Sequence, residues 1–312
     1  MLTGALIVWF AEAALSTTLV AADIGRTPES PVLKWGFVIV TLYTGPVGLV
    51  LYLWSCREPL PATHEAYVRA RWRQVVGSTM HCVAGDGIGI LVAAAVTSPL
   101  GLPAWTDFLV EYAAGFGFGW TIFQALFMKD MAGGSYRRSL EMTFLAEFVS
   151  MNGLMAGMAA VSIPWRQSVA AASGPDHLGF WFVYCVALTA GFAVSYPLNW
   201  WLVAAGLKHG MMTVRPGGQP VPLAGGLALA GAALGSASPH HPTPHHDAHI
   251  RDDAVGTPEE PAAPAGHLGP EGSVAMARMS RLQERAAMVV VSLAVLAVGL
   301  GVAGTTGSLL SR

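Results

Sequence analysis

The sequence predicts an all-α membrane protein, a polytopic helical bundle with about seven transmembrane helices. Of its 312 residues, 53% are hydrophobic and 12% are charged, whereas about a quarter of the residues in a soluble domain are charged. The hydrophobic residues gather in blocks of roughly twenty, the length of helix that crosses a bilayer. The formal net charge of −2 gives no indication of a nucleic-acid partner, and the lipid bilayer is the expected partner.

The N-terminal part of the chain predicts two spans. We interpret the first as a retained helix, because no Lys or Arg precedes it and Glu12 interrupts its apolar run. Cleavage is the alternative, since Val20-Ala21-Ala22 resembles a signal-peptide cleavage site. The second contains Pro46 directly after Gly45, which predicts a kink within the helix. The predicted boundaries are residues 2–22 and 32–54 for these helices, within a region 1–56, and 57–77 for a basic cytoplasmic loop.

The rest of the chain predicts a four-helix core, a linker and one further span. Pro99 and Pro103 mark the turn between the third and fourth helices, and Gly133 and Gly134 mark the next turn. The linker is rich in His, Pro and Ala, which cannot bury enough apolar surface to fold, so we predict that it is disordered. The predicted spans are 78–97, 105–128, 139–163 and 179–206 in a core of residues 78–212, then 286–310 in a C-terminal region 286–312 that follows the linker 213–285.

Lys and Arg residues gather in alternate loops, which orients the predicted helices by the positive-inside rule. With the N-terminus in the cytoplasm, thirteen of the 17 Lys and Arg residues fall in cytoplasmic loops. The four on the other side are Arg26, Lys34, Arg166 and Arg312. We therefore predict a multi-pass protein with a cytoplasmic N-terminus and an external C-terminus.

Ionisable side chains within the predicted spans are candidates for function, because burying a charge in a bilayer is costly. Asp86 and Glu147 each lie about eight residues, or ~12 Å, from the inner ends of the third and fifth helices. These two carboxyl groups are therefore expected to meet. Cys82 lies four residues before Asp86, so that both share one helix face, and His81 lies beside them.

The residue types around Asp86 suggest a site for a metal ion or a proton. Imidazole, thiolate, thioether and carboxylate groups all bind metal ions, and Cys together with Met favours copper(I). Met151 and Met155 follow Glu147 in steps of four, and the segment Lys208–Met212 is a further candidate. The candidate metal ligands are His81, Cys82, Asp86, Glu147, Met151 and Met155.

Each of these features also has a structural interpretation. Methionines in apolar helices usually fill gaps between side chains, and a carboxyl pair can serve only to hold two helices together. Five histidines in the linker could buffer a transition metal, but low-complexity sequence alone also explains them. They are His240, His241, His245, His246 and His249.

Several different short motifs lie along the third to sixth predicted helices and the loops between them. They are His81-Cys82-Val83-Ala84-Gly85-Asp86, Phe123–Met131, Gly133–Tyr136, Glu147–Asn152 with Met155–Met158, Tyr196–Leu202 and Gly206–Met211. Together they resemble a family of bacterial polytopic membrane proteins catalogued only as a domain of unknown function, over about residues 75–212. The resemblance implies a four-helix core in the bacterial inner membrane and no established activity. Asp86 stands where some members carry a second Cys, which argues against a fixed Cys-based metal site.

Two functional interpretations remain open from the sequence. The first is transport or binding of protons or of a metal cation, with a copper or other transition-metal ion as the expected cofactor. The second is a membrane redox or assembly subunit whose polar core is structural. A haem would need His81 and His209, both on the inner side. The sequence contains no nucleotide-binding motif, and we do not predict an enzyme.

Overall fold

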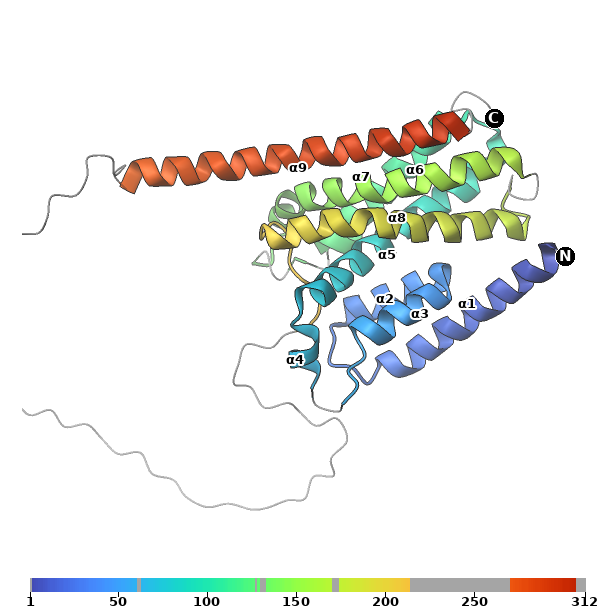
Figure 1. Cartoon of the computed structure of the whole chain (residues 1–312), viewed down its shortest axis with the longest axis horizontal. Helices are drawn as coiled ribbons and strands as arrows, with labels where there is room; N and C mark the ends of the chain where they lie inside the picture. The colour runs from blue at the N-terminus through green and yellow to red at the C-terminus, as the bar shows by residue number, and fades with distance from the viewer. Residues whose placement is uncertain are drawn as a thin grey trace, which may run out of the picture. The chain divides into compact units, whose positions relative to one another are not determined.

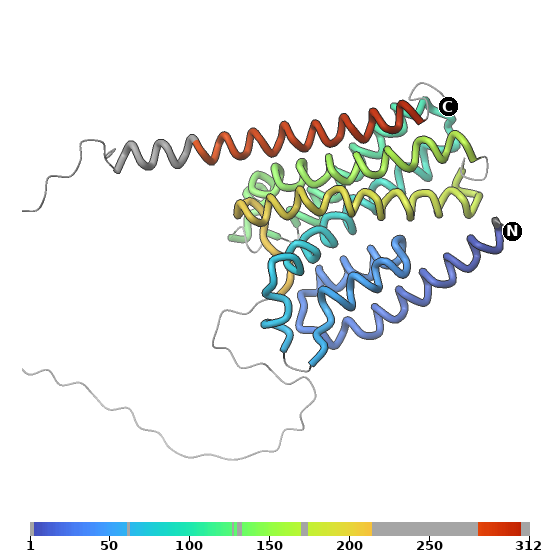
Figure 2. The backbone as a smooth tube through the Cα atoms, viewed as in Figure 1, coloured from blue at the N-terminus to red at the C-terminus, as the bar shows by residue number. Residues whose placement is uncertain are grey.

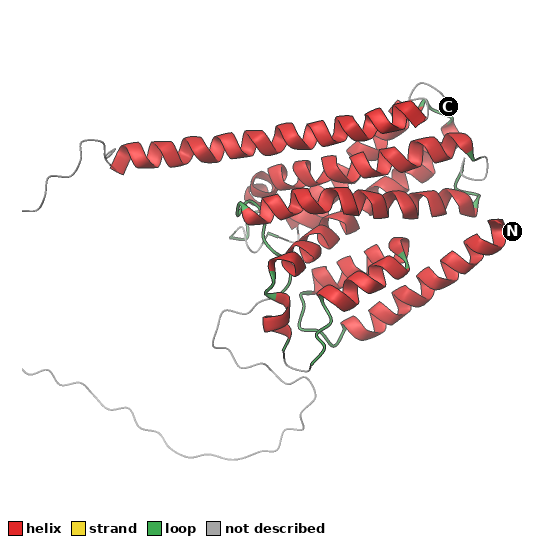
Figure 3. Ribbon diagram, in the orientation of Figure 1, coloured by secondary structure: helices red, strands yellow, loops and turns green. Residues whose placement is uncertain are grey.

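The computed structural model describes residues 2–60, 63–126, 128–129, 133–169, 174–213 and 270–306, and these form helices and loops without strands (Figure 3). The predicted all-α fold is therefore confirmed. Most of the predicted linker, including its histidine tract, lies outside the described residues. Helices α1 to α8, with α9 from Arg281 onward, form one compact unit.

Among the residues that the structure describes, five helices are long and apolar enough to cross a membrane. They correspond to five of the predicted spans, with longer bounds at several ends. Helix α5 already begins within the predicted basic loop, and α9 begins within the predicted linker, so residues 270–285 are helical. The helices are α1 (Leu2–Ile24), α5 (Arg71–Thr97), α7 (Tyr136–Ser168), α8 (Leu178–Ala204) and α9 (Pro270–Thr306) (Figure 1).

The predicted span 105–128 consists of two consecutive segments with different helical geometry. Helix α6 (Ala104–Phe118) continues into η2 (Gly119–Leu126), a π-helix in which each turn holds more residues than an α-turn. A π-helical stretch is rare and is frequently found at a functional site. Its wider turns rotate its side chains relative to those of α6. Gln124 is one of the side chains that this rotation repositions.

The predicted span 32–54 is a helical hairpin in the structure and not a span. Helix α2 (Pro31–Thr44) ends at Gly45, whose φ of 58° and ψ of −130° turn the chain into α3 (Pro46–Ser55). The rings of Phe37 and Tyr52 lie 5.6 Å apart across the two helices. With 14 and 10 residues, the helices are about 21 and 15 Å long, shorter than the ~30 Å hydrocarbon core of a bilayer.

Contacts with α1 show that the hairpin returns to the end from which it starts. At its tip, a methyl group added to Gly45 would lie 3.4 Å from Ala13 Cβ, about halfway along α1. At its base, Tyr52 Oη donates a hydrogen bond to Asp23 Oδ2 over 2.8 Å, and Arg57 pairs with Asp23 at 2.7 Å. The predicted count of seven spans is therefore not confirmed.

The hairpin also changes where the described ends of the chain lie. Figure 2 shows the first residues of α1 and the last residues of α9 at the same end of the helices. Seven spans would place them at opposite ends, so that part of the predicted topology is not confirmed. The physical reason is that the chain reverses at Gly45 between two helices of 14 and 10 residues, each shorter than a bilayer core.

Small residues let the central helices approach closely, as expected where lipid offers no hydrophobic drive for association. A methyl group at Gly89 of α5 would lie 2.8 Å from Gly115 Cα of α6. One at Gly157 of α7 would lie 2.7 Å from Gly191 Cα of α8. These contacts bring α5 close to α6 and α7 close to α8.

We predict that both bases of the hairpin face the same side of the membrane. Cysteines introduced as Arg26→Cys and Leu60→Cys should react with a membrane-impermeant maleimide in the same preparation of vesicles. The native Cys56, Cys82 and Cys185 are buried and should give little background. Leu100→Cys, at the other end of α5, should react only in vesicles of the opposite orientation. Labelling of Arg26→Cys and Leu60→Cys from opposite sides would show that residues 31–55 cross the membrane.

Candidate functional site

Cys82 lies at the centre of a buried polar cluster to which four elements contribute. Its thiol, on α5, donates a hydrogen bond to Glu147 Oε2 of α7 over 3.0 Å. Its sulfur accepts hydrogen bonds from Gln124 Nε2 of η2 at 2.7 Å and from Lys208 Nζ, just beyond α8, at 2.8 Å. Cys82 and Glu147 are fully buried. The cluster therefore joins one thiol, one amide, one ammonium and one carboxyl group away from water.

The carboxyl groups of Asp86 and Glu147 lie beside each other within this cluster, because a methyl group added at Gly119 would meet both. Both side chains are fully buried, and Asp86 Oδ1, Asp86 Oδ2 and Glu147 Oε1 receive no hydrogen bond from any described residue. Gly119, the first residue of η2, makes this arrangement possible. A methyl group there would overlap Asp86 Oδ1 and lie 2.7 Å from Glu147 Oε1. The structure thus brings together the two carboxyl groups that the sequence placed at similar depth.

Asn199 holds Lys208 in position over the cluster. Lys208 Nζ donates a hydrogen bond to Asn199 Oδ1 at 2.5 Å. Asn199 Nδ2 in turn donates to Ser150 Oγ at 2.9 Å and to the Ser195 carbonyl at 3.1 Å. The chain reaches Lys208 through Gly206, whose φ of 68° lies in the left-handed region that glycine adopts at no steric cost.

The other predicted ligands lie around this cluster and not within it. His81 is fully buried, with its ring 5.7 Å from that of Phe123. Met151 packs against Gly115 of α6, where a methyl group would lie 2.8 Å from Met151 Cε. Met155 is one turn further along α7. In the part of the chain that the structure describes, no group of three or more His, Cys, Asp or Glu residues could hold a metal ion.

A cavity of about 420 Å³ adjoins the cluster at the end of the helices where α8 finishes. Gln124 and Lys208, which both contact Cys82, line it, and so do Thr143, His209 and Arg285. We call it the Lys208 cavity. It gives the polar cluster a route toward that end of the helices, and three of its lining side chains are basic.

A second cavity, of about 210 Å³, lies at the opposite end and contains a buried ion cluster. Arg166 pairs there with Asp107 at 3.2 Å and with Glu111 at 3.6 Å. Tyr184 Oη donates a hydrogen bond to Glu111 Oε1 at 2.5 Å. Met155 lines this cavity from α7. We call it the Arg166 cavity.

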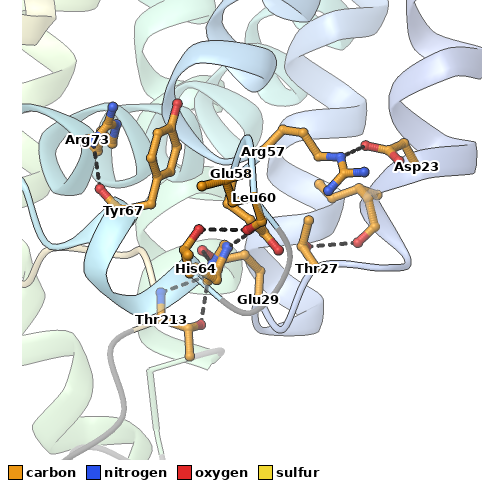
Figure 4. A network of polar contacts seen from close by, with 12 residues as sticks. Asp23, Thr27, Glu29, Arg57, Glu58, Leu60, His64, Tyr67, Arg73 and Thr213 are labelled. Carbon is orange, nitrogen blue, oxygen red and sulfur yellow. Dashed lines mark hydrogen bonds and ion pairs between the residues drawn. The ribbon is translucent and has the colours of Figure 1, made fainter. Parts of the chain in front are cut away.

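His64 joins three segments at the base of the hairpin (Figure 4). Its Nε2 lies 2.8 Å from Glu29 Oε1, and its Nδ1 lies 2.9 Å from Glu58 Oε2. The other Glu29 oxygen, Oε2, accepts hydrogen bonds from Thr213 N at 2.8 Å and from Thr213 Oγ1 at 2.7 Å. Glu29 thereby ties the chain that follows Lys208 to the loop between α1 and α2.

The position of His64 between two carboxylates favours its protonated form. A neutral imidazole has one N–H group, so only the imidazolium donates to both carboxylates. Burial opposes this charge, but the hydrogen bonds and charges of Glu29 and Glu58 outweigh it and raise the pKa of His64 above its ordinary value of 6.5. The helix α4 (His64–Val68) that begins at this residue is therefore anchored by an ion pair on each side.

Three residues of the cluster are not among the candidates predicted from the sequence: Gly119, Gln124 and Asn199. Gln124 and Asn199 interrupt apolar runs and lie within the family-like motifs. Their amides carry no charge and so are not ionisable candidates, but burying an unpaired amide within a membrane is also costly. Nothing in the sequence marks Gly119 among the neighbouring glycines, because its role depends on the π-helix.

We predict that the His64 cluster stabilises the fold in a pH-dependent way. Its contribution, on the order of 1 kcal/mol after solvent screening, is fully present below pH 6.5 and is lost as the pH rises through the higher folded-state pKa. Thermal unfolding of the purified protein between pH 6 and pH 9 should therefore show the largest gap between wild type and His64→Gln at the acidic end. A gap that stays constant over this range would contradict the assignment.

One family model matches part of the chain. No curated protein and no solved structure matches it. Residues 71–208 match the family described as "Domain of unknown function (DUF4396)". These residues run from the start of α5 to Lys208, and so they contain the polar cluster. The predicted resemblance to a family of unknown function is thus confirmed over residues 71–208.

Proposed function

We propose that this membrane protein moves protons across the bilayer through the helices α5 to α8. The observation that carries the proposal is that one face of α7 joins the two cavities at opposite ends of these helices. Between the cavities, that face bears Glu147, whose carboxyl group lies beside that of Asp86 at Gly119. Buried carboxyl groups within transmembrane helices are typical of proton relays.

Four residues of α7 mark the proposed path. Thr143 lines the Lys208 cavity and Met155 lines the Arg166 cavity. Glu147 and Met151 lie between them, and each step is four residues, so the four side chains share one face. Along the helix axis the two lining residues are separated by about 18 Å, which leaves the carboxyl pair as the relay between the two aqueous openings.

The charges of the cluster support the exchange of a proton. Lys208 brings one positive charge to two carboxyl groups that are shielded from water. A proton shared by Asp86 and Glu147 would balance that charge and supply the donor that their oxygens lack. Loss and gain of this proton would change the charge of the site while its side chains stay in place.

An apolar layer separates the carboxyl pair from the Arg166 cavity. Ile90 and Met151 are fully buried and pack at Gly115, next to the Asp86 backbone carbonyl. A hydrophobic constriction of this kind gates passage in many channels. The unbranched thioether of Met151 changes conformation readily, so we expect movement of Met151 to control when a proton passes.

Transport of a soft metal ion such as copper(I) is the second candidate. The thiol of Cys82 and the thioethers of Met151 and Met155 favour it. The Lys208 ammonium group bound to Cys82 Sγ counts against it, because a cation already occupies that sulfur. Copper in the purified protein, measured by mass spectrometry and reduced by Cys82→Ala, would favour this candidate over proton transport.

The distribution of basic residues supports an orientation in the membrane. The hairpin moves Arg26 and Lys34 to the end of the helices where Lys208 lies, together with Arg57, Arg73 and Arg137. Among the described Lys and Arg residues of the compact unit, Arg166 is the one at the opposite end. By the positive-inside rule, we propose that the Lys208 cavity faces the cytoplasm of a bacterial cell. Leu2 and Thr306 would then both face outward.

We predict that Asp86→Asn and Glu147→Gln each lower proton flux by about tenfold or more. Protein reconstituted into liposomes with a trapped pH-sensitive dye would report the flux after a potential is imposed. Glu12→Gln is the matched control, because Glu12 lies in a spanning helix with its side chain exposed, away from the path. Equal flux for Glu147→Gln and Glu12→Gln would refute the proposed relay.

We also predict that Gly119→Ala disrupts the path and that Gly117→Ala does not. The added methyl group at Gly119 would overlap Asp86, whereas at Gly117 nothing lies within 4 Å. Overpacking of this kind costs roughly 1–3 kcal/mol, while alanine for glycine at an open helix position stabilises by about 0.5–1 kcal/mol. Thermal unfolding and proton flux should therefore both fall for Gly119→Ala alone. Similar values for the two variants would contradict the close approach of η2 to Asp86.

A further inference from the structure

We infer that the ammonium group of Lys208 fills a cation-binding site, and that this site takes a small monovalent cation of ammonium size when Lys208 withdraws. The inference rests on the proposed proton path, because both use the carboxyl pair. It adds a second substrate: a cation that would exchange with the proton at the same place.

The atoms around Lys208 Nζ are those that bind a cation. Asn199 Oδ1 and Cys82 Sγ accept hydrogen bonds from it at 2.5 and 2.8 Å. Glu147 lies directly behind Cys82, through the 3.0 Å hydrogen bond of the thiol. Amide and carboxylate oxygens are ligands that hard cations prefer. The ammonium group therefore sits where a free cation would be coordinated.

The cluster also contains more acceptors than donors, which points independently to a ligand. Both oxygens of Asp86 and one of Glu147 are fully buried and receive no hydrogen bond from any described residue. A lysine contributes a single charge and three donors from a tethered position. A free cation could move deeper, toward these oxygens, where the Lys208 side chain does not extend.

Lys208 lies on a segment that can move without unfolding a helix. Its backbone N–H is 3.2 Å from the Leu202 carbonyl at the end of α8, and Gly206 provides the turn between them. The segment is fixed again at Met211, whose N–H donates a hydrogen bond to the Gln74 carbonyl at 3.4 Å, and at Thr213, which Glu29 holds (Figure 4). Between these points the Lys208 side chain borders a cavity of about 420 Å³. The cavity provides room for the ammonium group once it leaves Cys82 and Asn199.

The test uses the purified full-length protein and Lys208→Ala, which leaves the site without its tethered cation. Thermal unfolding would be compared in equal concentrations of ammonium, potassium and N-methylglucamine chloride. We expect ammonium or potassium to raise the Tm of Lys208→Ala by about 2–4 °C or more over N-methylglucamine, with little change in wild type. His209→Ala, which lines the same cavity, is the matched control and should behave as wild type does.

A second substitution identifies the site. Adding Asn199→Ala to Lys208→Ala should abolish the cation effect, because the amide oxygen is one of the ligands. If Lys208→Ala does not accumulate, Lys208→Gln serves instead, since its side chain ends one atom short of the ammonium position. Failure of both variants to accumulate in medium rich in ammonium would count against the site.

The outcomes separate this inference from the proposed proton path. Wild-type proton flux without a cation effect on Lys208→Ala would overturn the cation site and leave the path intact. A cation effect on Lys208→Ala without wild-type proton flux would overturn the proton path and leave the cation site intact. A shift of equal size in Lys208→Ala, His209→Ala and wild type would indicate a general salt effect and overturn the inference.

Discussion

The close approach of the Gly119 backbone to the carboxyl groups of Asp86 and Glu147 is the contact on which the site depends. Any side chain at this position would displace Asp86. Gly119 is also the residue at which α6 becomes the π-helix η2, and the wider turns rotate the following side chains so that Gln124 reaches Cys82. One residue thus positions two of the groups that close the cluster, which is the kind of local irregularity that π-helical segments provide at functional sites.

This arrangement stabilises the helices less than an apolar core would. A buried polar atom without a partner costs about 1–3 kcal/mol, and three such carboxyl oxygens gather at Asp86 and Glu147. Natural proteins depart from polar satisfaction mainly where function requires it. A purely structural role would be served by the partner-rich geometry of Asn199, which bonds to Ser150, the Ser195 carbonyl and Lys208. The unpaired oxygens at the carboxyl pair therefore favour a functional interpretation over a register-fixing one.

Sequence reasoning placed the long helices and the depth of Asp86 and Glu147, because both follow from hydropathy and a fixed rise per residue. It missed the hairpin, because hydropathy counts apolar residues and does not reveal a reversal of direction. Gly45 and Pro46 were interpreted as a kink, whereas the positive φ of Gly45 turns the chain back. The positive charges indicate the reversal. In a seven-span topology, Arg26 and Lys34 lie on the external side, against the positive-inside rule. When residues 31–55 form a hairpin, both lie at the same end as most other basic residues.

The hairpin and the polar cluster are consequently parts of one construction. Because α3 returns to the end where α2 begins, Glu29 and Glu58 lie close enough for His64 to bridge them. Glu29 then holds Thr213, five residues beyond Lys208. A spanning second helix would have carried Glu58 to the other side of the membrane, and His64 could not have bonded to both carboxylates. The reversal at Gly45, outside the family-matched residues 71–208, therefore supports the segment that sets Lys208 against Cys82.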